Sequence, residues 1–192
     1  MKSAVVVFSG IDRVLIRSVL LAGALAAAIG SGSAQPLPAP PSATPRPPVA
    51  VSGWRYERGD SDVHIFHCEQ SGCGAGSKVS YRFYAPGNLM TLEQFRGDQQ
   101  QIVKALEQRT PGLRMTIMGI DGDSGTAVPR LFKARRLAVA PSGVSEYQVS
   151  GFLFGAAASA SLISSSRDEK ASNANYALFA VAVMLVLVPK TR

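Results

Sequence analysis

The residues with the most chemical potential are four side chains within ten positions of the chain, namely His64, His67, Cys68 and Cys73. Two imidazoles and two thiolates form a ligand set that zinc accepts. Residues 63–68, however, have the apolar and β-branched content of a strand, in which residues three apart point to opposite faces. His64 and Cys68 would then share one face and His67 the other. This geometry argues against the metal site, and we predict none.

A second candidate centre is Ser124, in the sequence Gly-Asp-Ser-Gly at residues 122–125. This sequence matches the surroundings of the nucleophile in chymotrypsin-like serine proteases, and His67-Cys68 resembles the pair at their general base. A triad needs that base within hydrogen-bond reach of the hydroxyl. His67 and Ser124 are 57 positions apart with a predicted helix between them, and Thr126-Ala127-Val128 departs from the protease pattern. A hairpin turn is the favoured interpretation, and we predict no catalytic residue.

Positive charge is densest on a predicted strand that carries Arg130, Lys133, Arg135 and Arg136. Strand alternation would place Arg130 and Arg136 on one face and the other two on the opposite face. The favoured interpretation is a solvated edge strand whose charge discourages aggregation. The alternative is a binding site for an anionic partner, such as lipid headgroups or an acidic polysaccharide.

The glycine-rich segment at residues 72–78 has some likeness to a phosphate-binding loop. It lacks the Gly-Lys-Ser/Thr ending of that motif, and no helix follows it at once. We therefore predict no nucleotide site and no cofactor.

Hydrophobic patterning predicts the elements that would position these residues. Residues 63–68 and 79–84 are expected strands, followed by strands at 113–120, 131–139 and 146–154, with a turn at 121–126. Thr91 and Gln94 form a capping box for a helix over 92–109, on which Gln99 would face solvent. Ser166 and Glu169 form a second capping box before the terminal helix.

Along the sequence, the expected elements are strands, a helix, several more strands and a final helix. This order favours an antiparallel sheet over a parallel sheet built from alternating strands and helices. We expect a single α+β domain over residues 51–192. It would contain about five to seven strands and two main helices, at about residues 91–109 and 168–184.

The N-terminal 34 residues have the three parts of a secretory signal peptide. Lys2, Arg13 and Arg17 precede an apolar run at 19–29, and small residues occupy 32–34. Residues 35–50 then contain seven of the chain's twelve prolines, which predicts a disordered, extended Pro-rich linker. We expect a periplasmic or secreted protein; the alternative is an uncleaved signal anchor.

Export would place Cys68 and Cys73, which are the chain's two cysteines, in an oxidising compartment. A disulfide between them would close a glycine-rich loop and stabilise the fold by about 2 kcal/mol. This pairing is the favoured interpretation of the two thiols.

An unbroken apolar run of 13 residues occupies positions 176–188. As a helix it would span about 20 Å, which is short of the ~30 Å hydrocarbon core of a bilayer. A buried helix that runs into a terminal strand is favoured, and a membrane tail is the alternative.

The sequence SLISSSRDE at residues 161–169 leads from a strand pattern into this apolar helix, and MTLEQF at 90–95 opens the earlier helix. Over about residues 78–183 this arrangement resembles the small PsbP-like and DcrB-like extracytoplasmic domains. The resemblance implies an accessory or binding role without catalytic residues, and it carries no functional residue onto this chain.

These patterns predict an exported, non-enzymatic accessory or binding module of the cell envelope. Its partner would be an envelope protein or an anionic envelope surface, and not nucleic acid; the net charge of the chain is +7. The alternative is a membrane-associated protein, held by its N-terminal anchor or its C-terminal tail. An enzyme, with Ser124 or the His64 group as its centre, ranks third.

Overall fold

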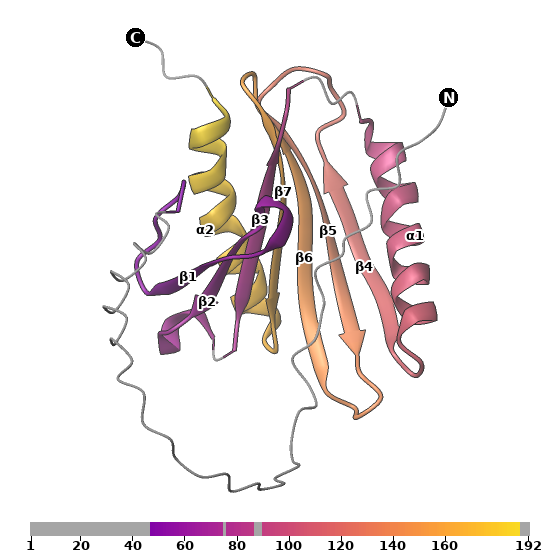
Figure 1. The fold of residues 1–192 in the computed structure, drawn as a ribbon. Coiled ribbons are helices and arrows are strands. Elements are labelled where there is room, and N and C mark those ends of the chain that lie inside the picture. Colours follow the sequence, from indigo (N-terminus) through magenta and orange to yellow (C-terminus); the bar gives the residue numbers. More distant parts are fainter. Residues whose placement is uncertain (1–46, 75, 87–89, 189–192) are drawn as a thin grey trace, which may run out of the picture. The chain divides into compact units, whose positions relative to one another are not determined.

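The computed structural model describes residues 47–74, 76–86 and 90–188. The predicted signal peptide at 1–34 and nearly all of the predicted linker at 35–50 lie outside them. The described residues form one antiparallel sheet of seven strands, in the order β1-β2-β3-β7-β6-β5-β4, together with two α-helices (Figure 1). The predicted α+β class is confirmed.

The chain contributes its elements in a simple order. Three strands come first, followed by α1, then by four more strands and finally by α2. Their bounds are β1 (Trp54–Arg58), β2 (His64–Cys68), β3 (Lys78–Tyr84), α1 (Leu92–Arg109), β4 (Arg114–Gly122), β5 (Arg130–Val139), β6 (Ser145–Phe154), β7 (Ser159–Ser166) and α2 (Glu169–Leu187). β7 pairs with β3 on one side and β6 on the other, so it joins the N-terminal strands to the later ones.

The two helices cover opposite faces of the sheet, as neighbouring residues of β5 demonstrate. Phe132 packs with Phe95 of α1, whereas Leu131 packs against the core beneath α2. Because successive strand residues alternate, these two contacts lie on opposite faces. α1 packs on β4 and β5, and α2 packs on β3, β7 and β6 (Figure 1).

The larger hydrophobic core lies beneath α2. Its fully buried side chains include Phe66, Val79, Tyr81, Leu153, Leu162, Phe179 and Val183. α1 covers a smaller core of Phe95, Phe132, Ala134 and Phe154. The fold therefore depends mainly on the contact of α2 with the sheet.

The two helices begin in different ways. At α1 the predicted capping box is present: Gln94 N donates to Thr91 Oγ1 at 3.2 Å, and Thr91 N donates to Gln94 Oε1 at 2.8 Å. At α2 the predicted box is wrong, because Ser166 still pairs within the sheet. Asp168 caps α2 instead, and its Oδ1 accepts from Ala171 N at 2.7 Å.

Two further expectations are wrong. Gln99 does not face solvent; it is buried beneath α1, where its Oε1 accepts a hydrogen bond from Ser150 Oγ at 3.0 Å. The apolar run at 176–188 does not enter a strand, since α2 continues to Leu187 and Val188 is its C-cap.

Candidate functional site

The four basic residues of β5 do not lie on an edge strand. β5 pairs with β4 on one side and with β6 on the other, so the edge-strand interpretation is wrong. Arg130 and Arg136 lie on the face that packs on α1, which they share with the buried residues Phe132 and Ala134. Lys133 and Arg135 lie on the α2 face. The four side chains therefore do not form a common anion site.

Lys133 and Arg135 each face a carboxylate. Lys133 Nζ lies 4.0 Å from Asp121 Oδ2, and Arg135 Nη1 lies 3.9 Å from Glu169 Oε1. Both pairs are partly exposed, and such pairs contribute about 0–1 kcal/mol. Each of these two cations therefore already has a carboxylate of the domain nearby.

Arg130 is held by aromatic rings. Its guanidinium carbon lies 4.1 Å from the centre of the Phe154 ring and 5.1 Å from that of Phe132. Nη1 donates to the carbonyl oxygen of Gly125 at 3.5 Å. Cation–π contacts of this kind stabilise a desolvated cation, so Arg130 closes one end of the smaller core.

Arg136 is different, because its buried cation has no partner among the described residues. The residue is 3% exposed, and its Nε and Nη1 atoms find no hydrogen-bond acceptor in that part of the chain. No ion pair joins it to a carboxylate of the described residues, whereas Lys133 and Arg135 each have one. Burial lowers the pKa of Arg136 to about 10. An isolated buried charge costs several kcal/mol, so this guanidinium has much to gain from an anion.

Polar side chains continue from Arg136 across the same face of the sheet. The strand register places Gln148 of β6 opposite Arg136, then Ser165 of β7 opposite Gln148, and Lys78 of β3 opposite Ser165. We call these four residues the Arg136 row. Glu146 belongs to the same surroundings, since its Oε1 accepts from Gln148 Nε2 at 3.2 Å.

An aromatic cluster lies farther along this face of the sheet. The Tyr84 ring stacks on Phe152 with centroids 5.6 Å apart, and the Arg82 guanidinium lies 5.3 Å from the centre of the Tyr84 ring. Tyr84 Oη lies 3.2 Å from Ser161 Oγ. The sequence did not reveal either this cluster or the Arg136 row, because both depend on the pairing of β7 between β3 and β6.

The two cysteines and the two histidines each make contacts within the domain. Cys68 and Cys73 lie at disulfide distance, with Cα atoms 6.0 Å apart. Asn175 Nδ2 of α2 donates to the Cys73 carbonyl oxygen at 2.8 Å, which fixes this loop to the helix. His64 is buried against Tyr81, with ring centroids 4.8 Å apart. Among the described residues no group of three metal-ligating side chains lies close enough to hold an ion.

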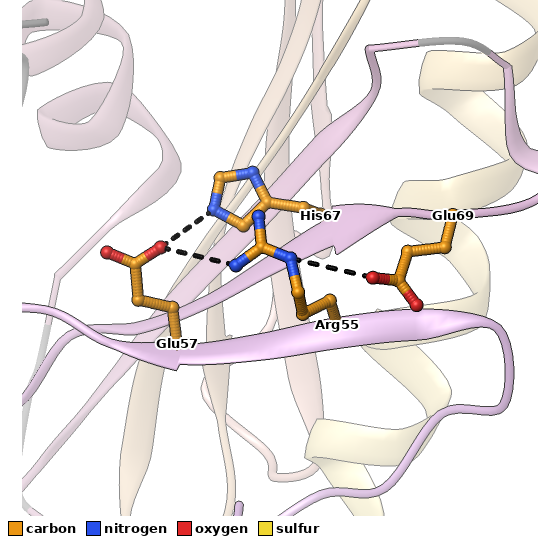
Figure 2. A network of polar contacts seen from close by, with 4 residues as sticks. All are labelled: Arg55, Glu57, His67 and Glu69. Atoms are coloured by element: carbon orange, nitrogen blue, oxygen red, sulfur yellow. Dashed lines mark hydrogen bonds and ion pairs between the residues drawn. The ribbon is translucent and has the colours of Figure 1, made fainter.

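His67 instead joins a network of charges on the β1–β2 hairpin (Figure 2). Its Nε2 lies 3.1 Å from Glu57 Oε2, and Arg55 lies 3.9 Å from Glu57 and 3.5 Å from Glu69. These side chains are largely exposed, so each pair adds at most about 1 kcal/mol. The network was missed because β1 was not predicted as a strand.

Ser124 lies in the exposed turn between β4 and β5, where Asp123 Oδ2 accepts from Leu131 N at 2.8 Å. Four strands separate β4 from β2, which carries His67. At ~4.8 Å per strand spacing, the two strands lie about 24 Å apart. The geometry therefore excludes a Ser124–His67 catalytic pair.

Comparison with known proteins finds a likeness in fold. No protein-family profile and no curated protein matches this chain. The chain is similar to the solution structure of cyanobacterial PsbP (CyanoP) from Synechocystis sp. PCC 6803, with a TM-score of 0.50 and 9% sequence identity. The match covers 69% of this chain and 79% of that one. The resemblance to a PsbP-like fold that the sequence indicated is thus confirmed, at the level of the fold.

Proposed function

We propose that this chain is an exported, non-enzymatic accessory module of the cell envelope that binds an acidic polysaccharide through Arg136. The PsbP-like fold and the signal-peptide pattern support the exported accessory role. The observation that carries the binding role is the buried Arg136 guanidinium, with its unpaired Nε and Nη1 atoms. Perturbed and unpaired charges of this kind cluster at functional sites.

Apart from the Glu146 carboxylate, which accepts from Gln148 Nε2, the surroundings of Arg136 suit an extended anion. Gln148 and Ser165 lie opposite each other on the next two strands and offer neutral donors, and Lys78 adds a second cation. At ~4.8 Å per strand, the Arg136 row spans about 14 Å. A chain of carboxylated sugars can follow this row, and the Arg136 side chain, which is 3% exposed, must turn outward to place its planar guanidinium fork on one carboxylate.

The test is calorimetric titration of the full chain with polygalacturonate at low salt. We expect Arg136→Met to weaken binding by about tenfold or more, because the charge-assisted hydrogen bonds are lost. The same substitution should raise the free energy of unfolding by about 1 kcal/mol or more, since it removes an unpaired buried charge. Loss of binding together with a gain in stability identifies a binding residue.

Arg114→Met is the matched control, because Arg114 is an exposed arginine on the neighbouring strand β4 and carries the same charge. It should change binding less than twofold. An equal loss in both variants would point to diffuse charge attraction and would overturn the proposal, as would unchanged binding in Arg136→Met. If Arg136→Met does not fold, Arg136→Lys keeps the charge and should still weaken binding severalfold.

A further inference from the structure

α2 is apolar on two faces, and its inner face forms the larger core of the domain. Phe179, Val183 and Leu187 are fully buried, and Tyr176 is nearly so. The Phe179 ring meets Trp54 and Phe66 with centroids 5.0 and 4.9 Å apart. This face is fixed to the sheet.

The outer face of α2 is apolar as well. Leu178, Val181 and Leu185 follow each other at helical spacing, and Val181 and Leu185 are 65% and 71% exposed. From Ala174 onward every exposed residue of the helix is apolar. We call this surface the outer stripe of α2; it consists of Ala174, Ala177, Leu178, Val181, Leu185 and Val188.

The inner face limits what this stripe can do in a membrane. α2 has 19 residues and is long and apolar enough to cross a bilayer, judged by length and composition alone. A spanning position would, however, pull Phe179, Val183 and Leu187 out of the core. The helix can bury both apolar faces only if it lies in the plane of a membrane–water interface, with the sheet on one side and lipid on the other.

Basic residues lie close to the outer stripe in the sequence. Arg167 and Lys170 stand at the start of α2, and Lys190 and Arg192 follow Val188 in the sequence. Of the acidic neighbours, Asp168 caps the helix and Glu169 faces Arg135. Long cationic side chains beside an apolar surface place their charges among lipid headgroups.

A second copy of the chain fits this stripe poorly. The stripe is about 21 Å long and about 10 Å wide, or about 200 Å², whereas a stable interface buries ~800 Å² per partner.

We propose that the outer stripe of α2 binds in the plane of an anionic lipid bilayer, with its apolar side chains at the boundary between the headgroups and the acyl chains. This inference does not rest on Arg136, which lies on the opposite face of the sheet.

The test uses the full chain with a polarity-sensitive NBD label at Ala177→Cys, attached under non-reducing conditions. Ala177 is exposed on the stripe, and the reference site is Ser142→Cys in the exposed turn between β5 and β6. Vesicles of phosphatidylcholine with about one-third phosphatidylglycerol should blue-shift the label at 177 and raise its emission about twofold or more. The label at 142 should stay in water, and pure phosphatidylcholine should give a weaker response at 177.

Two variants complete the test. Leu178→Ser/Val181→Ser/Leu185→Ser should weaken the response at 177 by about tenfold or more. The matched control Met118→Ser/Val128→Ser/Val144→Ser removes exposed apolar side chains elsewhere and should leave that response intact. The proposal fails if vesicles do not change the emission at 177. It also fails if the shift appears in buffer and grows with protein concentration, which would indicate a second copy.

Discussion

His64 illustrates how a residue with catalytic potential becomes structural once its surroundings are known. Its ring is stacked on Tyr81, and its Nδ1 lies 3.0 Å from Tyr56 Oη. Burial lowers the pKa of His64; Arg58 adds to this decrease, and Asp62 opposes it. A neutral imidazole packed among aromatic rings fits a core residue.

The lowered pKa predicts a pH dependence of stability. Below about pH 6.5 the unfolded chain binds a proton that the folded chain excludes. Stability is therefore full above that pH and is lost as the pH falls toward the lower pKa of the folded state, with a slope of at most about 1.4 kcal/mol per pH unit. Urea unfolding at several pH values measures this slope.

Two variants assign that slope to one residue. His64→Gln should flatten the dependence, whereas His67→Gln, which changes the more exposed histidine on the opposite face, should retain it. Equal slopes in the wild-type chain and His64→Gln would contradict this account.

At the scale of elements, α2 lies close to the sheet because the residues opposite it at this contact are glycines, which have no side chain. A Cβ atom added at Gly155 would clash with the backbone of Leu187, and one at Gly151 would clash with Tyr176 Oη. Both glycines therefore allow the close approach of α2 to this end of β6.

Gly155→Ala should lower the free energy of unfolding by about 1–3 kcal/mol, because the backbone of α2 must move to admit the methyl group. The control is Gly97→Ala in α1, where a Cβ atom meets nothing within 4 Å. That change should stabilise the protein by up to about 1 kcal/mol through helix propensity. Denaturant titration measures both, and an unchanged stability in Gly155→Ala would contradict the close contact.

Elements with local signals were predictable, and those without them were not. The capping box of Thr91 and Gln94 lies within four residues, so the sequence predicted the start of α1. β1 was missed, since its five residues pair with β2 and have no strong pattern of their own. The start of α2 lies within one residue of the predicted position 168, but its cap was predicted wrongly, because sheet pairing kept Ser166 in β7.

At the scale of the whole molecule, the two proposed surfaces lie on opposite faces of one sheet. The outer stripe belongs to α2, and the Arg136 row faces the side on which α1 packs. If both proposals hold, the domain sits on a bilayer with its anion-binding face turned away from the lipid. Such an arrangement would connect a membrane surface to an acidic polymer.

Export itself is a prediction about the whole chain. When the full chain is expressed in a bacterium with a periplasm, we expect a periplasmic protein that begins at Gln35, because residues 32–34 suit a signal peptidase. Mass spectrometry of the purified protein identifies its first residue. Ala34→Leu should block cleavage, whereas Ala43→Leu in the linker should not, and a wild-type chain that retains Met1 in the membrane fraction would instead support the signal anchor.

The sequence by itself determined the α+β class, the length of α1, the alternation of charges on β5 and the apolar character of residues 176–188, since each is a local pattern of residue types. Only the tertiary structure decided that β5 is an interior strand, that Arg136 is buried without a partner among the described residues, and that one face of α2 forms the core while the other is exposed. These properties depend on which strands pair and which face a helix covers. Contacts between residues far apart in the chain set that outcome, and no local pattern records them.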